Sequence, residues 1–276
     1  MIVNMKEMLA DAAKGGYAVG GFNCASLESA VAAVRASEEL GVPFILQHAP
    51  VHEPHLPLSV AGPIMLQLAR AAKTPVAVHL DHGASVAHCL RALAMGFTSV
   101  MFDGSALPYE ENVRATKEIV SIAHAFGASV EGEIGHVGEA ANQSASDAYT
   151  TPEEAKAYYE ATGVDALAVA IGTAHGVYKQ KPKLDIGRLA AIRQAVDVPL
   201  VLHGGSGLSD DDFKNCVSSG IAKINVFTDL CLAGSAAMKE ASLQGAGYLE
   251  CRNMKVEAIR EEIKKKIRLF GSQGKA

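Results

Sequence analysis

Short apolar runs alternate along the chain with longer stretches in which apolar residues recur at helical spacing. The short runs predict eight strands, at Tyr17–Asn23, Pro43–His48, Pro75–His79, Thr98–Phe102, Ala128–Glu133, Asp165–Ala170, Val198–His203 and Ala222–Val226. The stretches between them predict helices at Leu27–Leu40, Val60–Ala72, Ser85–Met95, Glu110–Phe126, Pro152–Thr162, Ile186–Ala195 and Asp210–Ser218. Three further helices are expected at Met5–Lys14, Thr228–Leu243 and Val256–Phe270. Strands that alternate with helices in this way predict a single parallel α/β barrel domain over residues 1–276, with a helical extension near the C-terminus.

Polar side chains follow the predicted strands at their C-terminal ends. The third apolar run ends at His79, and Asp81, His82 and Gly83 come directly after it. The other strands lead to Asn23, His48, Asp103, Glu133, His175, His203 and Asn225. Barrel enzymes place their sites at this end of the strands, so the sequence predicts one shared pocket.

Three of these residues are histidines that each precede a glycine: His82, His175 and His203. A single histidine of this kind is usually a hydrogen-bonded loop residue. Three imidazoles from separate strand ends instead match a catalytic zinc site with an open position for substrate. Asp81 lies beside one of them and is assigned to proton transfer with a substrate hydroxyl, although it could also orient His82.

Glycine-rich segments follow the seventh and eighth strands. The first reads His203-Gly204-Gly205-Ser206-Gly207, and the second, around Asn225 and Thr228, closes the eighth strand. Loops at these two positions of a barrel often bind phosphate through backbone N–H groups, whereas the alternative is a turn without a ligand. Lys179 could add a cation to the same pocket.

Several motifs in order resemble the class II, zinc-dependent ketose-bisphosphate aldolases, which include the fructose-bisphosphate and tagatose-bisphosphate enzymes. The motifs are Leu80-Asp81-His82-Gly83, Asp103-Gly104-Ser105, Glu131-Gly132-Glu133, Ala174-His175-Gly176-Val177-Tyr178, Val201-Leu202-His203-Gly204-Gly205-Ser206-Gly207 and Lys223-Ile224-Asn225-Val226. The likeness runs nearly end to end, through Lys266-Ile267-Arg268-Leu269-Phe270-Gly271-Ser272.

The resemblance implies a (β/α)8 TIM barrel in which His82, His175 and His203 hold zinc. It implies that Asp81 acts on the C4 hydroxyl, and that Asp103 and Glu133 serve a second or displaced divalent ion. A Na⁺ or K⁺ ion is expected near the phosphate of dihydroxyacetone phosphate. The residues that we assign to substrate binding are Asn23, Gln47, Gly176, Lys179, Gly204, Gly205, Ser206, Asn225, Val226, Phe227, Thr228 and Arg252.

Three departures from the family pattern bear on the substrate. Many members carry a glutamate late in the loop after the fifth strand, where this chain has alanine, and Glu139 is assigned as its replacement. The loop Gln47–His55 has Ala49 and a cluster of histidines in place of a serine or threonine. It is either a proline-stiffened surface loop or a different binding site for the far end of the substrate. Phe227 stands at a usually polar position, and the segment around Arg252 looks shortened, although Arg252 could still bind a distal anion.

Fructose 1,6-bisphosphate is therefore the default substrate expected, followed by tagatose 1,6-bisphosphate and by a ketose 1-phosphate modified at C6. A metal-dependent hydrolase and a non-catalytic sugar-phosphate-binding barrel are the alternatives. The formal net charge of −5 gives no basic patch for nucleic acid, and the run Lys264-Lys265-Lys266 is read as a solvated helix face. Five scattered cysteines and no membrane-spanning apolar run favour a cytoplasmic protein, which the resemblance makes a homodimer or homotetramer.

Overall fold

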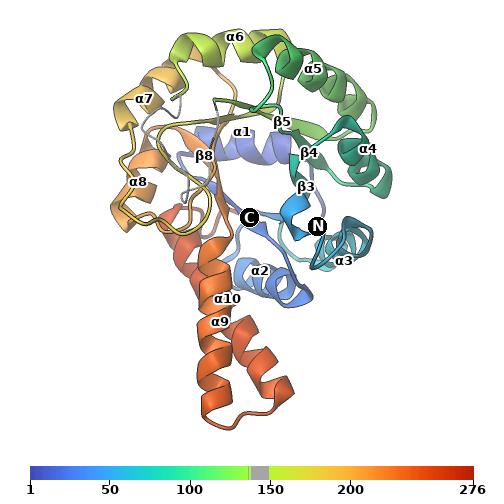
Figure 1. Cartoon of the computed structure of the whole chain (residues 1–276), viewed down its shortest axis with the longest axis vertical. Helices are drawn as coiled ribbons and strands as arrows, with labels where there is room; N and C mark the ends of the chain where they lie inside the picture. The colour runs from blue at the N-terminus through green and yellow to red at the C-terminus, as the bar shows by residue number, and fades with distance from the viewer. Residues whose placement is uncertain (136, 138–148) are drawn as a thin grey trace.

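The computed structural model describes residues 1–135, 137 and 149–276, and it shows a closed barrel of eight parallel strands (Figure 1). The strands follow one another around the barrel in sequence order, and β8 pairs with β1. Their bounds are β1 Val19–Asn23, β2 Phe44–His48, β3 Val76–Gly83, β4 Ser99–Phe102, β5 Ser129–Ile134, β6 Ala166–Val169, β7 Leu200–Leu202 and β8 Ile221–Val226. The predicted (β/α)8 architecture is confirmed.

Helices surround this barrel on its outer side. They are α2 Leu27–Leu40, α3 Leu58–Ala71, α4 Val86–Met95, α5 Tyr109–Ala125, α6 Pro152–Thr162, α7 Ile186–Ala195, α8 Asp210–Ser218, α9 Thr228–Leu243 and α10 Tyr248–Leu269. Local sequence fixes several of their ends. Ser26 and Thr151 cap α2 and α6 through reciprocal capping boxes, and Gly41 and Gly163 end the same helices in the left-handed conformation.

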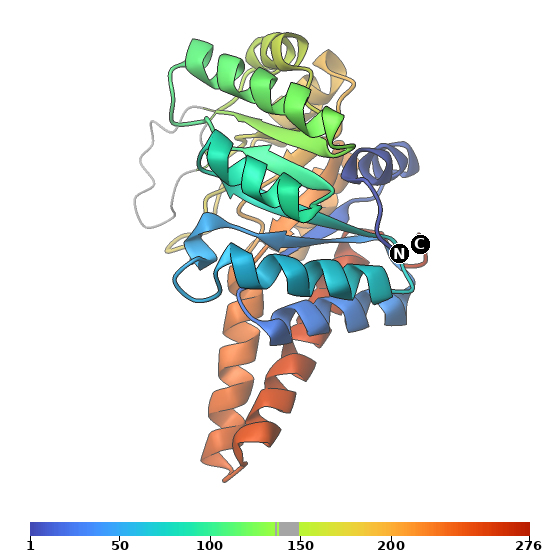
Figure 2. The same cartoon turned by 90° about the vertical axis from the view of Figure 1, so that its right-hand side faces the viewer.

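The helix α1 (Met5–Gly15) closes the N-terminal end of the barrel. Its buried face, with Met5 and Leu9, packs against small and β-branched residues that point into the barrel, such as Ala77 and Ala166. Both chain termini lie at this end (Figure 2). A functional site is therefore expected at the other end of the barrel, where the C-terminal ends of the strands lie.

The observed bounds lie within two residues of the predicted ones except in two elements. The strand β3 continues to Gly83, past the predicted end at His79, so Asp81 and His82 belong to the strand itself. The helix α10 begins at Tyr248 rather than Val256. Its first turns expose Tyr248 and Leu249 to solvent and therefore lack the buried apolar spacing that marks the later turns.

The helices α9 and α10 pack against each other and project from the barrel as a two-helix arm (Figures 1 and 2). In the first turns of α10, the Arg252 Nε donates to Glu28 Oε1 at the start of α2 over 3.0 Å, and Lys255 lies 3.7 Å from the same carboxylate. Among the residues that the structure describes, no helix has the length and apolar character needed to cross a membrane.

Candidate active site

A cavity of about 460 Å³ opens at the C-terminal ends of the strands. Asn23 (β1), Asp81 and His82 (β3) and Asn225 (β8) reach it from the strands. The remaining described lining residues come from the segments that follow the strands, including the 3-10 helix Pro50–His52 and the start of α9. They are Ala49, Pro50, Val51, His52, Ala84, Asp103, Val137, His175, Gly176, Gly204, Gly205, Ser206, Phe227 and Thr228. The cavity thus gathers most of the residues that the sequence assigned to a shared pocket.

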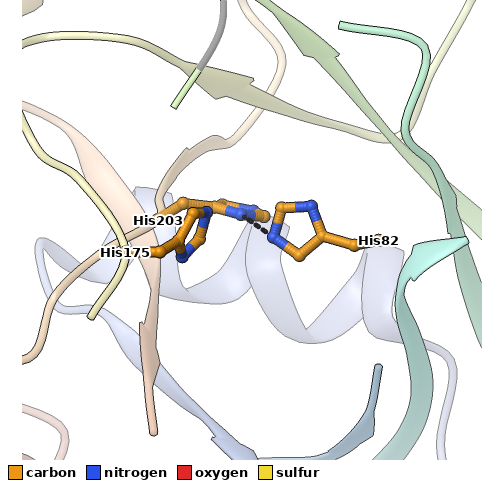
Figure 3. A group of neighbouring side chains, drawn as sticks. All are labelled: His82, His175 and His203. Atoms are coloured by element: carbon orange, nitrogen blue, oxygen red, sulfur yellow. Dashed lines mark hydrogen bonds between the residues drawn. The ribbon is translucent and has the colours of Figure 1, made fainter. Parts of the chain in front are cut away.

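The three histidines singled out from the sequence converge at this end of the barrel (Figure 3). His82 and His175 line the cavity, and His203 is fully buried beside them. The rings of His82 and His203 lie 4.5 Å apart between centroids, and that of His175 lies 5.0 Å from His82. One nitrogen of each ring lies within 4.8 Å of the other two. The separation of Nε2 of His82 and Nδ1 of His203 is 2.8 Å.

The outer nitrogens of two of these rings are held by carboxylates. Nδ1 of His82 lies 2.7 Å from Asp103 Oδ2, and Nε2 of His203 lies 2.7 Å from Glu131 Oε1. A carboxylate accepts a hydrogen bond from a ring N–H, so in each neutral ring the proton lies on the nitrogen beside the carboxylate. The lone pair of the other nitrogen then points toward the other ring. Two lone pairs at 2.8 Å repel unless a cation or a proton lies between them. Nε2 of His175 is buried without a hydrogen-bond partner in the described part of the chain. This donor set therefore fits a divalent ion.

The backbone at His82 is held in an unusual conformation. Its φ of 49° lies in the left-handed region, where non-glycine residues are rare, and the β3–β4 register shifts between Leu80 and Gly83. A side chain at Gly83 could not fit, because its Cβ would lie 2.4 Å from the Met101 carbonyl oxygen. The irregularity turns His82 toward the cavity at the cost of strain, which is typical of functional sites.

Asp81 lies beside the three histidines and is almost fully buried. Its Oδ2 accepts from Asn23 Nδ2 at 2.8 Å, and its Oδ1 accepts from Asn225 Nδ2 at 2.9 Å. Burial alone would raise the pKa of Asp81, but the positive charges of His82, when that ring is protonated in the metal-free protein, and of Lys223 bring it well below its usual range. The carboxylate is therefore ionised and fixed in orientation, as a proton acceptor must be.

Another part of the cavity lining is built from glycine-rich backbone. Gly204 has a φ of +66°, and a Cβ there would lie 2.4 Å from the Ala174 carbonyl oxygen, so only glycine lets the two loops approach. Ser206 Oγ accepts hydrogen bonds of 3.2 Å from the N–H groups of Phe227 and Asp229, at the start of α9. Backbone N–H groups at such loops and at a helix N-terminus favour an anionic group.

Comparison with known proteins identifies the family. The model of the class II fructose-bisphosphate aldolases matches residues 3–275. The chain belongs to this family. Escherichia coli (strain K12) YdjI is 40% identical over 279 residues, with complete coverage of both proteins. The crystal structure of the E. coli K12 YdjI aldolase has a TM-score of 0.92 and 39% identity and covers both chains fully. A putative fructose-1,6-bisphosphate aldolase from Coccidioides immitis has a TM-score of 0.89 and 30% identity, covering 98% of this chain and 96% of the other.

Membership makes the protein a lyase of a generally metal-dependent family that acts on small sugar phosphates. A second set of potential metal ligands in this class II aldolase is His82, Asp103 and Glu133. Glu133 Oε2 is buried without a hydrogen-bond partner among the described residues and lies 3.8 Å from Nδ1 of His203. Burial raises the pKa of Glu133, and the nearby Asp103 adds to this, so a cation would be needed to keep both carboxylates charged.

Beneath the histidines, the class II aldolase contains a charged network that the sequence analysis did not anticipate. The Lys223 Nζ (β8) donates to Glu131 Oε2 (β5) over 2.7 Å, and both side chains are fully buried. Although burial opposes its ionisation, Lys223 brings the pKa of Glu131 down to about 2. The ionised Glu131 in turn accepts from His203. Ladder positions on opposite sides of a barrel cannot be paired from sequence spacing, which explains why this contact was missed.

We expect Lys223→Met to lower the free energy of unfolding of the metal-free protein by about 3–5 kcal/mol, because it leaves Glu131 as an uncompensated buried charge. Urea unfolding in the presence of chelator measures this change. The double variant Lys223→Met/Glu131→Gln should recover part of the loss. Lys214→Met is the control, since Lys214 and Asp211 form an exposed pair that contributes little. An unchanged unfolding midpoint in Lys223→Met would contradict this reading.

Four side chains assigned to substrate binding lie apart from the described cavity lining. Gln47 is buried behind Asn23 and donates to its Oδ1 over 3.0 Å, and Val226 packs in the core, which leaves only its main chain available. Lys179 is exposed on the loop after β6, and Arg252 is bound to Glu28. Glu139 lies outside the residues that the structure describes. The cavity also contains His52, which the sequence analysis noted only as part of a histidine cluster.

Proposed function

We propose that this class II aldolase is zinc-dependent and reversibly cleaves a ketose 1-phosphate into dihydroxyacetone phosphate and an aldehyde. The observation that carries the proposal is the 2.8 Å separation of two imidazole nitrogens, Nε2 of His82 and Nδ1 of His203, with the ring of His175 beside them. Three nitrogen ligands with an open fourth position are the usual donor set of catalytic zinc. A zinc ion bound there would act as a Lewis acid and stabilise the negative charge on the departing dihydroxyacetone phosphate.

The residues of the chain supply the remaining requirements of the reaction. The ionised Asp81 takes the proton of the C4 hydroxyl while the C3–C4 bond breaks, its electron pair remains on C3, and C4 becomes the aldehyde carbon. Asn23 and Asn225 hold the carboxylate of Asp81 in place for this transfer. Gly204 and Ser206 would bind the C1 phosphate through a backbone N–H and the Ser206 O–H. Gly205 lies beside them, and its own N–H donates to the Asn225 carbonyl oxygen. The proton that C3 finally receives is assigned, as from the sequence, to Glu139.

Fructose 1,6-bisphosphate is the default substrate by family, with tagatose 1,6-bisphosphate and 6-modified ketose 1-phosphates as alternatives. A metal-dependent hydrolase could use the same donor set, but it has no need of a phosphate-binding end beside the metal ligands. The cavity is lined by two of the proposed metal ligands, His82 and His175, and by the glycine-rich segment Gly204–Ser206, which supports the aldolase over the hydrolase.

The proposal predicts stoichiometric release of dihydroxyacetone phosphate from a ketose 1-phosphate, because cleavage of C3–C4 yields one molecule per turnover. A panel of ketose phosphates with a coupled dehydrogenase measures this product, and inorganic phosphate is measured in parallel. A hydrolase would release phosphate without dihydroxyacetone phosphate. Binding of the sugar phosphates with neither product would indicate a non-catalytic barrel.

A further inference from the structure

One end of the cavity is formed by the short 3-10 helix η1 (Pro50–His52), which follows β2. The ring of His52 lies 4.8 Å from that of Phe227, which follows β8. Since β8, β1 and β2 are neighbours in the barrel, this contact spans the end of β1 above Asn23. His52 is 1% exposed and lines the cavity with Ala49 and Val51. His52 thus forms the part of the cavity wall that follows β2 and faces Phe227.

The hydrogen bonds of His52 determine which of its nitrogens carries a proton. The Ala49 backbone N–H donates to Nδ1 over 3.2 Å, so Nδ1 presents a lone pair and the proton of the neutral ring is on Nε2. Burial, reinforced by His48, lowers the pKa of His52 to about 4, which keeps the ring neutral. Nε2 is buried without a hydrogen-bond partner among the described residues. A buried, unpaired N–H donor beside a cavity is costly unless a ligand accepts from it.

The charge of this region disfavours a second phosphate. No lysine or arginine occurs among the described residues that line the cavity, and Asp81 and Asp103 contribute negative charge. Around His52 the lining is apolar, with Pro50, Val51 and Phe227. A phosphate dianion placed here would lose its hydration without gaining a cationic partner. A hydroxyl group needs only the single neutral donor that His52 offers.

We propose that His52 selects the aldehyde half of the substrate by donating its Nε2–H to a hydroxyl oxygen there. The preferred aldehyde is then an unphosphorylated hydroxyaldehyde, in place of the glyceraldehyde 3-phosphate that fructose 1,6-bisphosphate, the default substrate by family, would release. This rests on the proposed aldol reaction, in which the C1 phosphate lies at the glycine-rich loop and the C4 hydroxyl at Asp81. The carbons beyond C4 then extend toward η1. His52 is thereby a specificity-determining residue that takes no part in proton transfer.

The test is condensation of dihydroxyacetone phosphate with three aldehydes: glyceraldehyde, glyceraldehyde 3-phosphate and propionaldehyde, which lacks hydroxyl groups. The wild-type enzyme should show a higher kcat/KM with glyceraldehyde than with glyceraldehyde 3-phosphate. In His52→Ala, the ratio of kcat/KM for glyceraldehyde to that for propionaldehyde should fall about 10-fold, the effect of one lost hydrogen bond. His52→Gln, whose amide keeps a donor, should recover part of the ratio.

His55→Ala is the matched control, because His55 is an exposed histidine close to η1 and should leave the ratio unchanged. A wild-type preference for glyceraldehyde 3-phosphate overturns the proposal, and it does so without any variant having to fold. An equal loss with glyceraldehyde and propionaldehyde in His52→Ala also overturns it, since that is the result of a merely structural role. If none of the three aldehydes condenses, the proposed function itself is overturned, and the role of His52 with it.

Discussion

Replacing Asp81 with asparagine should lower kcat for cleavage about 10²- to 10⁴-fold, the usual contribution of a positioned acid–base group. Asparagine has nearly the same shape as aspartate but cannot accept the proton of the C4 hydroxyl. Asn23 and Asn225 hold both oxygens of Asp81, which fixes the carboxylate in one orientation for the proton transfer. Steady-state kinetics measure the loss, and Asp185→Asn, at the exposed start of α7, is the control with unchanged kcat.

A second measurement separates this chemical role from a general disturbance of the site. Exchange of a C3 proton of dihydroxyacetone phosphate with solvent deuterium does not involve the C4 oxygen. Asp81→Asn should therefore retain this exchange far better than it retains cleavage. An equal loss of exchange and cleavage would mean that the substitution had damaged the metal or phosphate sites, and the assigned role of Asp81 would have to be abandoned.

Replacing His175 with alanine should abolish zinc binding near neutral pH and lower kcat/KM by about 10³-fold or more, because a Lewis acid contributes several kcal/mol to the transition state. Among the three histidines, His175 is the informative choice. His82 and His203 are hydrogen-bonded to Asp103 and Glu131, so removing either also disturbs a buried charge. Nε2 of His175 has no partner within the described residues, and burial lowers the pKa of His175 to about 3.

The metal-free His175→Ala protein should therefore unfold at the same denaturant concentration as the metal-free wild type. Metal analysis after gel filtration measures bound zinc, and His55→Ala is again the control. Retention of one zinc per chain in His175→Ala would show that another donor set, such as His82, Asp103 and Glu133, holds the ion.

The sequence was sufficient for the barrel because each strand is a short apolar run with a polar residue at or near its C-terminal end. For the same reason it placed His82, His175 and His203 at one end of the barrel, where the structure brings them together. It misjudged β3, since Asp81 is polar and buried and His82 is polar and half-buried, and a hydrophobic pattern cannot show that a strand continues through them.

The sequence also could not predict contacts between segments that lie far apart along the chain. The ion pair of Lys223 and Glu131 joins positions separated by 92 residues, and neither is distinguished by its neighbours in the chain. The position of His52 in the cavity wall likewise depends on its ring contact with Phe227, which follows β8. Both features arise from three-dimensional packing and have no periodic signal.

The central claim, that one zinc ion held by three histidines is required for cleavage, is tested most directly by a metal titration. The protein is depleted of metal with a chelator, and zinc is returned in steps while dihydroxyacetone phosphate release and bound zinc are measured together. The account predicts background activity without metal and a linear rise that stops at about one zinc per chain, as expected for a single catalytic site. Undiminished release of dihydroxyacetone phosphate by the metal-free protein would contradict it.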